Sequence, residues 1–176
     1  KFGRVFIFDS NLLHAARPVS RICNVLRSVV VFKTIDPKIN DPRVQFILDK
    51  TKGISHSGKT FFEHLFNTMT NLELDKKNSN DLCVAGLYHS IYGTEFYKFN
   101  DPTITRDQIK ELIGDYAENL VWLFCKTEDR INAFIDNTIG VDEKIRQDLI
   151  RLELANLYDQ RSNQNTIYRL EKELII

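Results

Sequence analysis

The apolar residues beyond residue 60 recur at helical spacing almost everywhere. The series opens with one continuous stripe made by Phe62, Leu65, Phe66, Met69 and Leu72. Apolar side chains three and four residues apart fall on one face of an α-helix, and no later run of β-branched residues could build a parallel sheet. The sequence therefore predicts a mainly α-helical fold, a bundle of about six helices.

Composition narrows the class of protein. With 176 residues the chain fits one domain and a small appendage, and its 24 basic and 24 acidic residues leave no net charge to attract nucleic acid or an anionic membrane. Cys23, Cys83 and Cys125 form no CxxC pair, which is typical of a reducing compartment. No apolar run approaches the roughly 20 residues that span a bilayer, and no leader is visible. We expect a cytoplasmic protein without nucleic-acid or membrane partners, in which homo-oligomers remain an option.

The first 36 residues differ in character from the rest. Residues 5–8 and 25–32 are rich in β-branched and aromatic side chains and predict a short β-hairpin. Two prolines within residues 36–42 indicate a linker, so we expect a division into residues 1–36 and residues 37–176. The chain begins at Lys1, which suggests a fragment of a longer protein.

One family resemblance lies in this hairpin. The order Gly3, Phe8, His14, Pro18 and Arg27, followed by residues 28–33, resembles the end of the double-stranded β-helix of Fe(II)/2-oxoglutarate oxygenases. The resemblance implies that His14 is the distal iron ligand and that Arg27 pairs with the 2-oxoglutarate carboxylate. The proximal ligand pair of that family would precede these strands, so the hairpin alone should not be an active oxygenase. An ordinary hairpin is the alternative.

A nucleotide-binding pattern lies near the start of the helical part. Residues 53–60 match GxxxxGK[ST], but no parallel sheet is predicted around them, and the pattern without its sheet carries a high risk of a false match. Thr60 and Glu63 instead predict a capping box that starts a helix. Asp41 followed by Pro42 predicts the start of the preceding helix, which Gly53 ends.

Two histidines fall on helices that should be buried. His64 lies beside the first apolar stripe, and residues 82–92 predict a central helix that is apolar on nearly every side. His89 shares a face of that helix with Ala85 and Gly86, whose small size would let another helix approach closely. A buried imidazole needs a polar partner. Two of them on adjacent helices favour a shared pocket over two separate core histidines.

A second resemblance covers residues 41–160. The strings at residues 56–58, 63–65 and 86–95 are similar to an uncharacterised family of HD-like helical domains, related to a superfamily of metal-dependent phosphohydrolases with a few diiron oxygenases. The resemblance implies that His64 and His89 are metal ligands for iron, zinc or manganese. Ser90 stands where HD enzymes carry an aspartate, and Asn156 where they carry the final aspartate. Neither side chain brings charge to balance a divalent cation.

The remaining helices follow from caps and stripes. They are expected to begin near Thr105, Asp115 and Glu128, then at Asp142, with a terminal amphipathic helix from about Ile167. The charges along these helices are interpreted as solvated faces.

Two functional classes remain open. In the first, the metal site is degenerate and the domain binds a small molecule or assists an upstream oxygenase domain. In the second, the domain is a metal-dependent hydrolase or oxygenase that acts on a small substrate, with or without a phosphate group. His56 and Glu95 are the expected catalytic residues. Metal-free acid–base chemistry by His89 with His56 or Glu95 is an alternative within the second class, and it requires these groups within hydrogen-bond reach.

Overall fold

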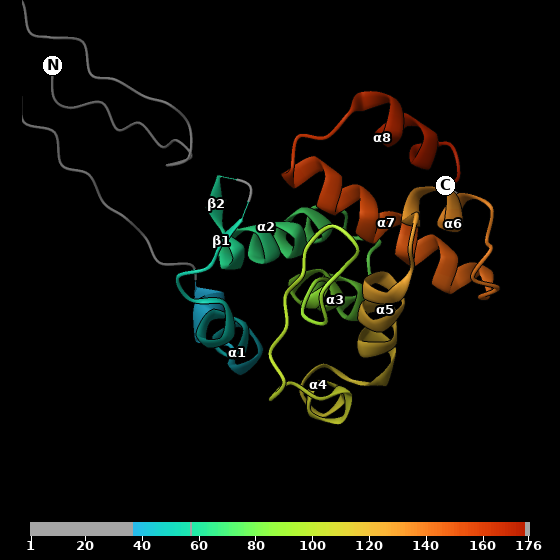
Figure 1. Cartoon of the computed structure of the whole chain (residues 1–176). Helices are drawn as coiled ribbons and strands as arrows, with labels where there is room; N and C mark the ends of the chain where they lie inside the picture. Colours follow the sequence, from blue (N-terminus) through green and yellow to red (C-terminus); the bar gives the residue numbers. More distant parts are fainter. Residues whose placement is uncertain (1–36, 57, 175–176) are drawn as a thin grey trace, which may run out of the picture. The chain divides into compact units, whose positions relative to one another are not determined.

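The computed structural model describes residues 37–56 and 58–174, and the predicted hairpin with His14 and Arg27 lies outside them. The described chain is mainly α-helical, as predicted, with eight α-helices where about six were expected (Figure 1). In order, the elements are a 3₁₀ turn η1 (Pro37–Asn40), α1 (Pro42–Thr51), β1 (Ser55–His56), β2 (Lys59–Thr60), α2 (Phe61–Glu73), α3 (Asn80–Tyr88), α4 (Arg106–Ile113), α5 (Asp115–Lys126), α6 (Arg130–Ile135), α7 (Glu143–Asp159) and α8 (Gln164–Glu171).

Local capping residues set the helix starts. The side chain of Asp41 accepts a hydrogen bond from the Arg43 amide at 2.8 Å, and Pro42 is the first residue of α1. Thr60 and Glu63 form the predicted capping box of α2, and each side chain accepts from the other residue's backbone amide. These bonds satisfy amide groups that the first turn of a helix leaves without partners.

The segment that matches the nucleotide-loop pattern forms a small antiparallel hairpin. Ser55 pairs with Thr60, and His56 pairs with Lys59. The hairpin leads directly into α2 and places His56 beside that helix. Among the described residues these are the two strands, so no parallel sheet surrounds the pattern there. The segment acts as a helix entry.

Helix α3 is the buried centre of the described body, next to α2, α5 and α7 (Figure 1). Every side chain from Leu82 to Tyr88 is buried. A Cβ atom added at Gly86 would lie 2.7 Å from Leu72 Cδ1 and 3.2 Å from the Met69 Cα, so this glycine permits the close contact of α2 with α3. The helix ends at Tyr88, four residues before the predicted end, and His89 is its C-terminal cap.

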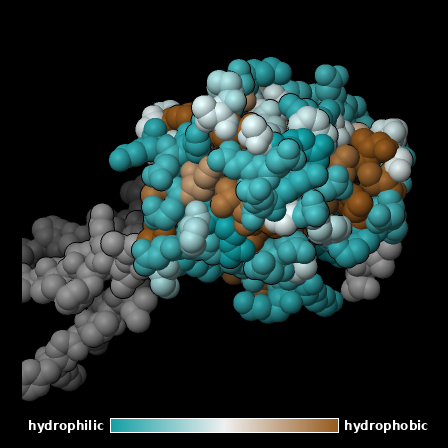
Figure 2. Space-filling view, turned by 90° about the horizontal axis from the view of Figure 1, so that it is seen from below, coloured by the Kyte–Doolittle hydropathy of each residue, from teal (hydrophilic) through white to brown (hydrophobic). Residues whose placement is uncertain are grey.

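Helix α7 crosses the body beside α2 (Figure 1). Several of its buried side chains are polar or charged. Glu153 and Asn156 are 3% and 4% exposed, although they lie among leucines. The face shown in Figure 2 is mostly hydrophilic, with hydrophobic side chains in separate groups. Of the helices described, none has the length and apolar character needed to cross a bilayer.

Candidate functional site

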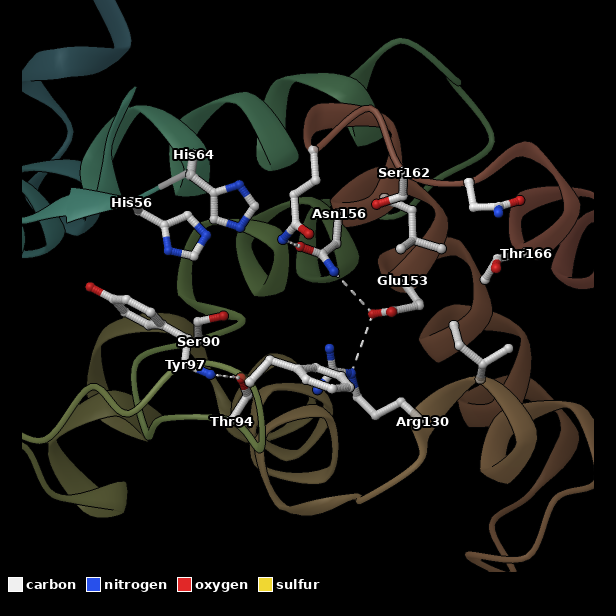
Figure 3. A pocket seen from close by; sticks show the side chains of 15 residues that line it. His56, His64, Ser90, Thr94, Tyr97, Arg130, Glu153, Asn156, Ser162 and Thr166 are labelled. Carbon is white, nitrogen blue, oxygen red and sulfur yellow. Dashed lines mark hydrogen bonds and ion pairs between the residues drawn. The ribbon is translucent and has the colours of Figure 1, made fainter. Parts of the chain in front are cut away.

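A pocket of about 470 Å³ opens between the hairpin, the turn after α3, α6, α7 and the start of α8 (Figure 3). Its lining combines aromatic, polar and charged groups, a composition that suits a small organic ligand. The side chains that line it include those of His56, His64, Ser90, Thr94, Phe96, Tyr97, Arg130, Ile131, Glu153, Asn156, Gln160, Ser162 and Thr166.

His64, which lines this pocket, contacts His89, which is fully buried and is not among the lining residues. Their Nε2 atoms lie 3.1 Å apart, and the two residues are 1% and 0% exposed. His64 Nδ1 contacts Asp159 Oδ2 at 2.6 Å, and His89 Nδ1 contacts the Gly86 carbonyl at 2.7 Å. The structure thus joins the two histidines predicted to share a pocket, and it gives each ring a second polar partner.

The hydrogen-bond partners of the two rings restrict which group can lie between the two Nε2 atoms. A carboxylate and a carbonyl oxygen only accept hydrogen bonds, so both Nδ1 atoms carry a proton. The two Nε2 atoms would then present opposed lone pairs unless a proton or another cation lies between them. Burial and the charge of His64 hold the pKa of His89 well below its usual value. On the other side of its ring, His64 faces the Asp159 carboxylate.

Asp159 supports the histidine pair from the last residue of α7. Its Oδ1 accepts from Lys59 Nζ at 2.7 Å and from Asn67 Nδ2 at 3.1 Å. Burial alone would raise its pKa, but the hydrogen bonds from His64, Lys59 and Asn67 outweigh burial and lower the pKa to about 2. Asp159 was not among the site residues predicted from the sequence. Its position could have indicated a role, because it lies three residues after Asn156 and therefore on the same face of the helix.

His56 lies against the other side of His64. Its ring centroid is 4.6 Å from that of His64 and 4.5 Å from that of Tyr97, which meets it edge-on. Burial, and then the charge of His64, lower its pKa. Its Nε2 atom is buried and has no hydrogen-bond partner in the part of the chain that the structure describes. A buried polar atom without a partner costs about 1–3 kcal/mol, so a group that enters this pocket could relieve the cost.

Arg130 and Glu153 form a buried ion pair across the pocket from the histidines (Figure 3). Arg130 Nε donates to Glu153 Oε2 at 3.3 Å, and Asn156 Nδ2 donates to the same oxygen at 3.2 Å. The guanidinium also lies 4.4 Å from the ring centroid of Phe124. Its Nη1 atom is buried without a partner. The interpretation of Arg130 as part of a solvated face was wrong, because its side chain is 5% exposed.

Ser90 and Asn156, which the HD-like resemblance predicted to stand in place of two aspartates, both line the pocket. The Asn156 oxygen accepts a hydrogen bond from Gln160 Nε2 at 2.9 Å, and its nitrogen donates to Glu153. Its amide oxygen is therefore already engaged. The buried amide thus bonds to side chains of its own helix, and it also interacts with His89, whose pKa this contact raises slightly against the larger effect of burial.

Glu95 lies apart from this cluster. It lines a second pocket of about 330 Å³ together with Cys125 and Lys126, and His56 is not among the lining residues there. Its Oε2 accepts from the Asp129 amide at 3.2 Å, while its Oε1 is buried without a partner. The ring nitrogens of His89 contact Gly86 and His64, not Glu95 or His56. The two residues predicted to be catalytic thus line different pockets, although Glu95 is close enough to Glu153 to contribute to its raised pKa.

The two histidines predicted to be metal ligands, His64 and His89, match the geometry of a metal site only in part. Both histidines have Nδ1 held by an oxygen acceptor and Nε2 directed at a common point, which is the usual arrangement behind histidine ligands. Across the described ranges, however, no group of three or more His, Cys, Asp or Glu side chains is placed to hold a metal ion. The nearest carboxylate, Asp159, contacts Nδ1 of His64 instead of the point between the rings.

Part of the chain that forms this site is similar to a known family. No curated protein and no solved structure matches the chain. The chain is similar, over residues 48–130, to the family described as a domain of unknown function (DUF6817). The matched segment includes His56, His64, His89 and Arg130, whereas Asp159 follows it.

Proposed function

We propose that this helical domain binds a small organic molecule in the pocket between the histidines and Arg130. The observation that carries the proposal is a pair of buried polar atoms on residues of the pocket wall, His56 Nε2 and Arg130 Nη1, that have no partner among the described residues. Native proteins leave few such atoms, and those they leave are often completed by a ligand or water. A pocket of about 470 Å³ lies within the usual range for small-molecule sites.

The HD-like resemblance predicts a site at the same residues, but with side chains that differ from the metal-binding side chains of HD enzymes. HD enzymes use two histidines and two aspartates around their metals, and here Ser90 and Asn156 take the aspartate positions. In this proposal the domain is a binding or accessory module derived from a metal-dependent enzyme. Within a longer protein it would serve the oxygenase that residues 1–36 resemble.

A pocket-blocking variant tests the proposal. Thr166 lines the pocket from the first turn of α8, while its neighbour Asn165 is exposed and outside the pocket. We expect Thr166→Trp to weaken binding of fragment-library hits by about tenfold or more, which corresponds to about 1.4 kcal/mol. Ligand-observed NMR measures the binding.

Asn165→Trp is the matched control, since it adds the same indole to the same helix. It should bind every hit as the unchanged protein does. The proposal fails if the unchanged protein binds no fragment, or if Thr166→Trp binds the hits equally well.

A metal-dependent hydrolase or oxygenase is the second candidate. It is favoured by one observation, the 3.1 Å approach of two Nε2 atoms whose Nδ1 partners are already fixed. The described residues offer the metal two neutral nitrogens and no carboxylate, so water or substrate would have to complete its coordination.

Elemental analysis separates the two candidates. We expect protein purified without a chelator to carry well under one iron, zinc or manganese ion per chain, because no carboxylate among the described residues joins His64 and His89 in a metal-binding group. One ion per chain that disappears in the double variant His64→Gln, His89→Gln would establish the second candidate instead. Circular dichroism of that variant shows whether the fold survives the change.

A further inference from the structure

The Nη1 group of Arg130 has N–H donors that no described residue accepts. A guanidinium presents five N–H donors in a planar fork that suits a carboxylate. Glu153 contacts the Nε edge at a long 3.3 Å, and the acceptor oxygen is shared with Asn156. Nη1, at the far end of the fork, is buried and unpartnered although the residue is only 5% exposed. A buried arginine in this state is suited to a second anion.

The surroundings of Arg130 favour an anion with a single charge. Among the described residues that line this pocket, Arg130 is the one lysine or arginine. Glu153 already offsets part of the charge of Arg130. A phosphate dianion would add two negative charges without a second fixed cation in the pocket wall, whereas a carboxylate adds one. Thr94 and Ser90 also line the pocket, and their hydroxyl groups can rotate to donate further hydrogen bonds.

The mouth of the pocket offers an apolar surface next to this polar group. Phe96 lines the pocket yet is 80% exposed, and its ring centroid lies 5.5 Å from the Arg130 guanidinium carbon. Ile131, the next residue of α6, also lines the pocket. An exposed aromatic side chain beside a ligand pocket gains contact area when an apolar group covers it.

We propose that the pocket takes a small carboxylate with an apolar or aromatic body, whose carboxylate is bound at Arg130 and whose body lies on Phe96 and Ile131. The inference rests on the proposed function, because it names the chemical class of the molecule that the same pocket would bind. Charge-assisted hydrogen bonds of this kind contribute more than neutral ones. A neutral analogue of the same shape should therefore bind much more weakly.

Three matched probes test this class: phenylacetate, phenylacetamide and phenyl phosphate. Each is titrated into isotope-labelled protein and followed by amide chemical shifts. We expect phenylacetate to bind about 10- to 100-fold more tightly than phenylacetamide, the ratio typical of a charge-assisted hydrogen bond. Shifts should centre on residues 94–97 and 130–131. Tighter binding of phenyl phosphate would overturn the choice of a carboxylate, and absence of phenylacetate binding would overturn the inference as a whole.

The double variant Arg130→Met, Glu153→Gln assigns the effect to the arginine. It removes both charges together and keeps an acceptor for Asn156, so no charge is left buried alone. Phenylacetate affinity should fall to that of phenylacetamide, which should not change. Equal affinity for acid and amide in the unchanged protein would overturn the carboxylate site while leaving the pocket's function intact. The Thr166→Trp comparison tests that function separately.

Discussion

Replacing Arg130 with alanine is expected to lower the free energy of unfolding by about 3–5 kcal/mol, the usual cost of breaking a buried ion pair. The cause is the carboxylate left behind: Glu153 is 3% exposed, and burial already raises its pKa even with the arginine present. The remaining donor, Asn156, is neutral. Urea unfolding at neutral pH measures the change.

The control for this substitution is the neutral double variant Arg130→Met, Glu153→Gln. It should be clearly more stable than Arg130→Ala, because it removes the unpaired charge along with its partner. If Arg130→Ala cost less than about 1 kcal/mol, the size of an exposed ion pair, the two groups would not be buried together in solution.

Acidification is expected to weaken the fold in a step that begins near pH 6.5. The pKa of His89 is far below 6.5 in the folded protein because of burial and the charge of His64. Below pH 6.5 the unfolded chain therefore binds a proton that the folded pair does not, and the free energy of unfolding falls as pH falls. The slope approaches about 1.4 kcal/mol per pH unit. Between pH 6.5 and pH 5 the loss should reach about 1–2 kcal/mol.

Chemical unfolding at a series of pH values, with a chelator present, measures this loss. His89→Gln should show a flatter dependence over the same range, whatever its stability at neutral pH. His56, whose pKa is also lowered, adds a smaller effect because it is less buried. Asp159 acts only at lower pH: it stabilises the fold above its ordinary pKa of 3.8, and that contribution is lost as pH falls toward 2. An unchanged slope in His89→Gln would contradict the assignment.

Local sequence signals predicted the helix starts well. Asp41, Thr60 and Asp142 cap helices as expected, because a cap depends on residues within one turn. The end of α3 was harder to place. Ile91 and Thr94 are as buried as the helix itself, so an apolar run continues through a turn that is no longer helical. Hydrophobicity reports burial, and at this point it does not distinguish a helix from a buried turn.

Local sequence patterns likewise predicted one part of the candidate site and not the other. The contact of His64 with His89 was predictable, since each lies at a buried position of an adjacent helix. The partners that give the site its charge were not. Arg130 and Glu153 are separated by 23 residues, and nothing in either local pattern marks them as buried. Their burial results from how α6 packs on α7, which is information that no single helix carries.

Asp159 also sets the order in which the domain can be completed. Its hydrogen bonds reach back 95 residues to His64 and 100 residues to Lys59, so they close loops that span most of the described chain. Contacts over such separations form late, because the entropy of closing the loop must first be overcome. The helices can form early from their own caps. The charged environment of the histidine pair exists only after α7 has docked beside α2.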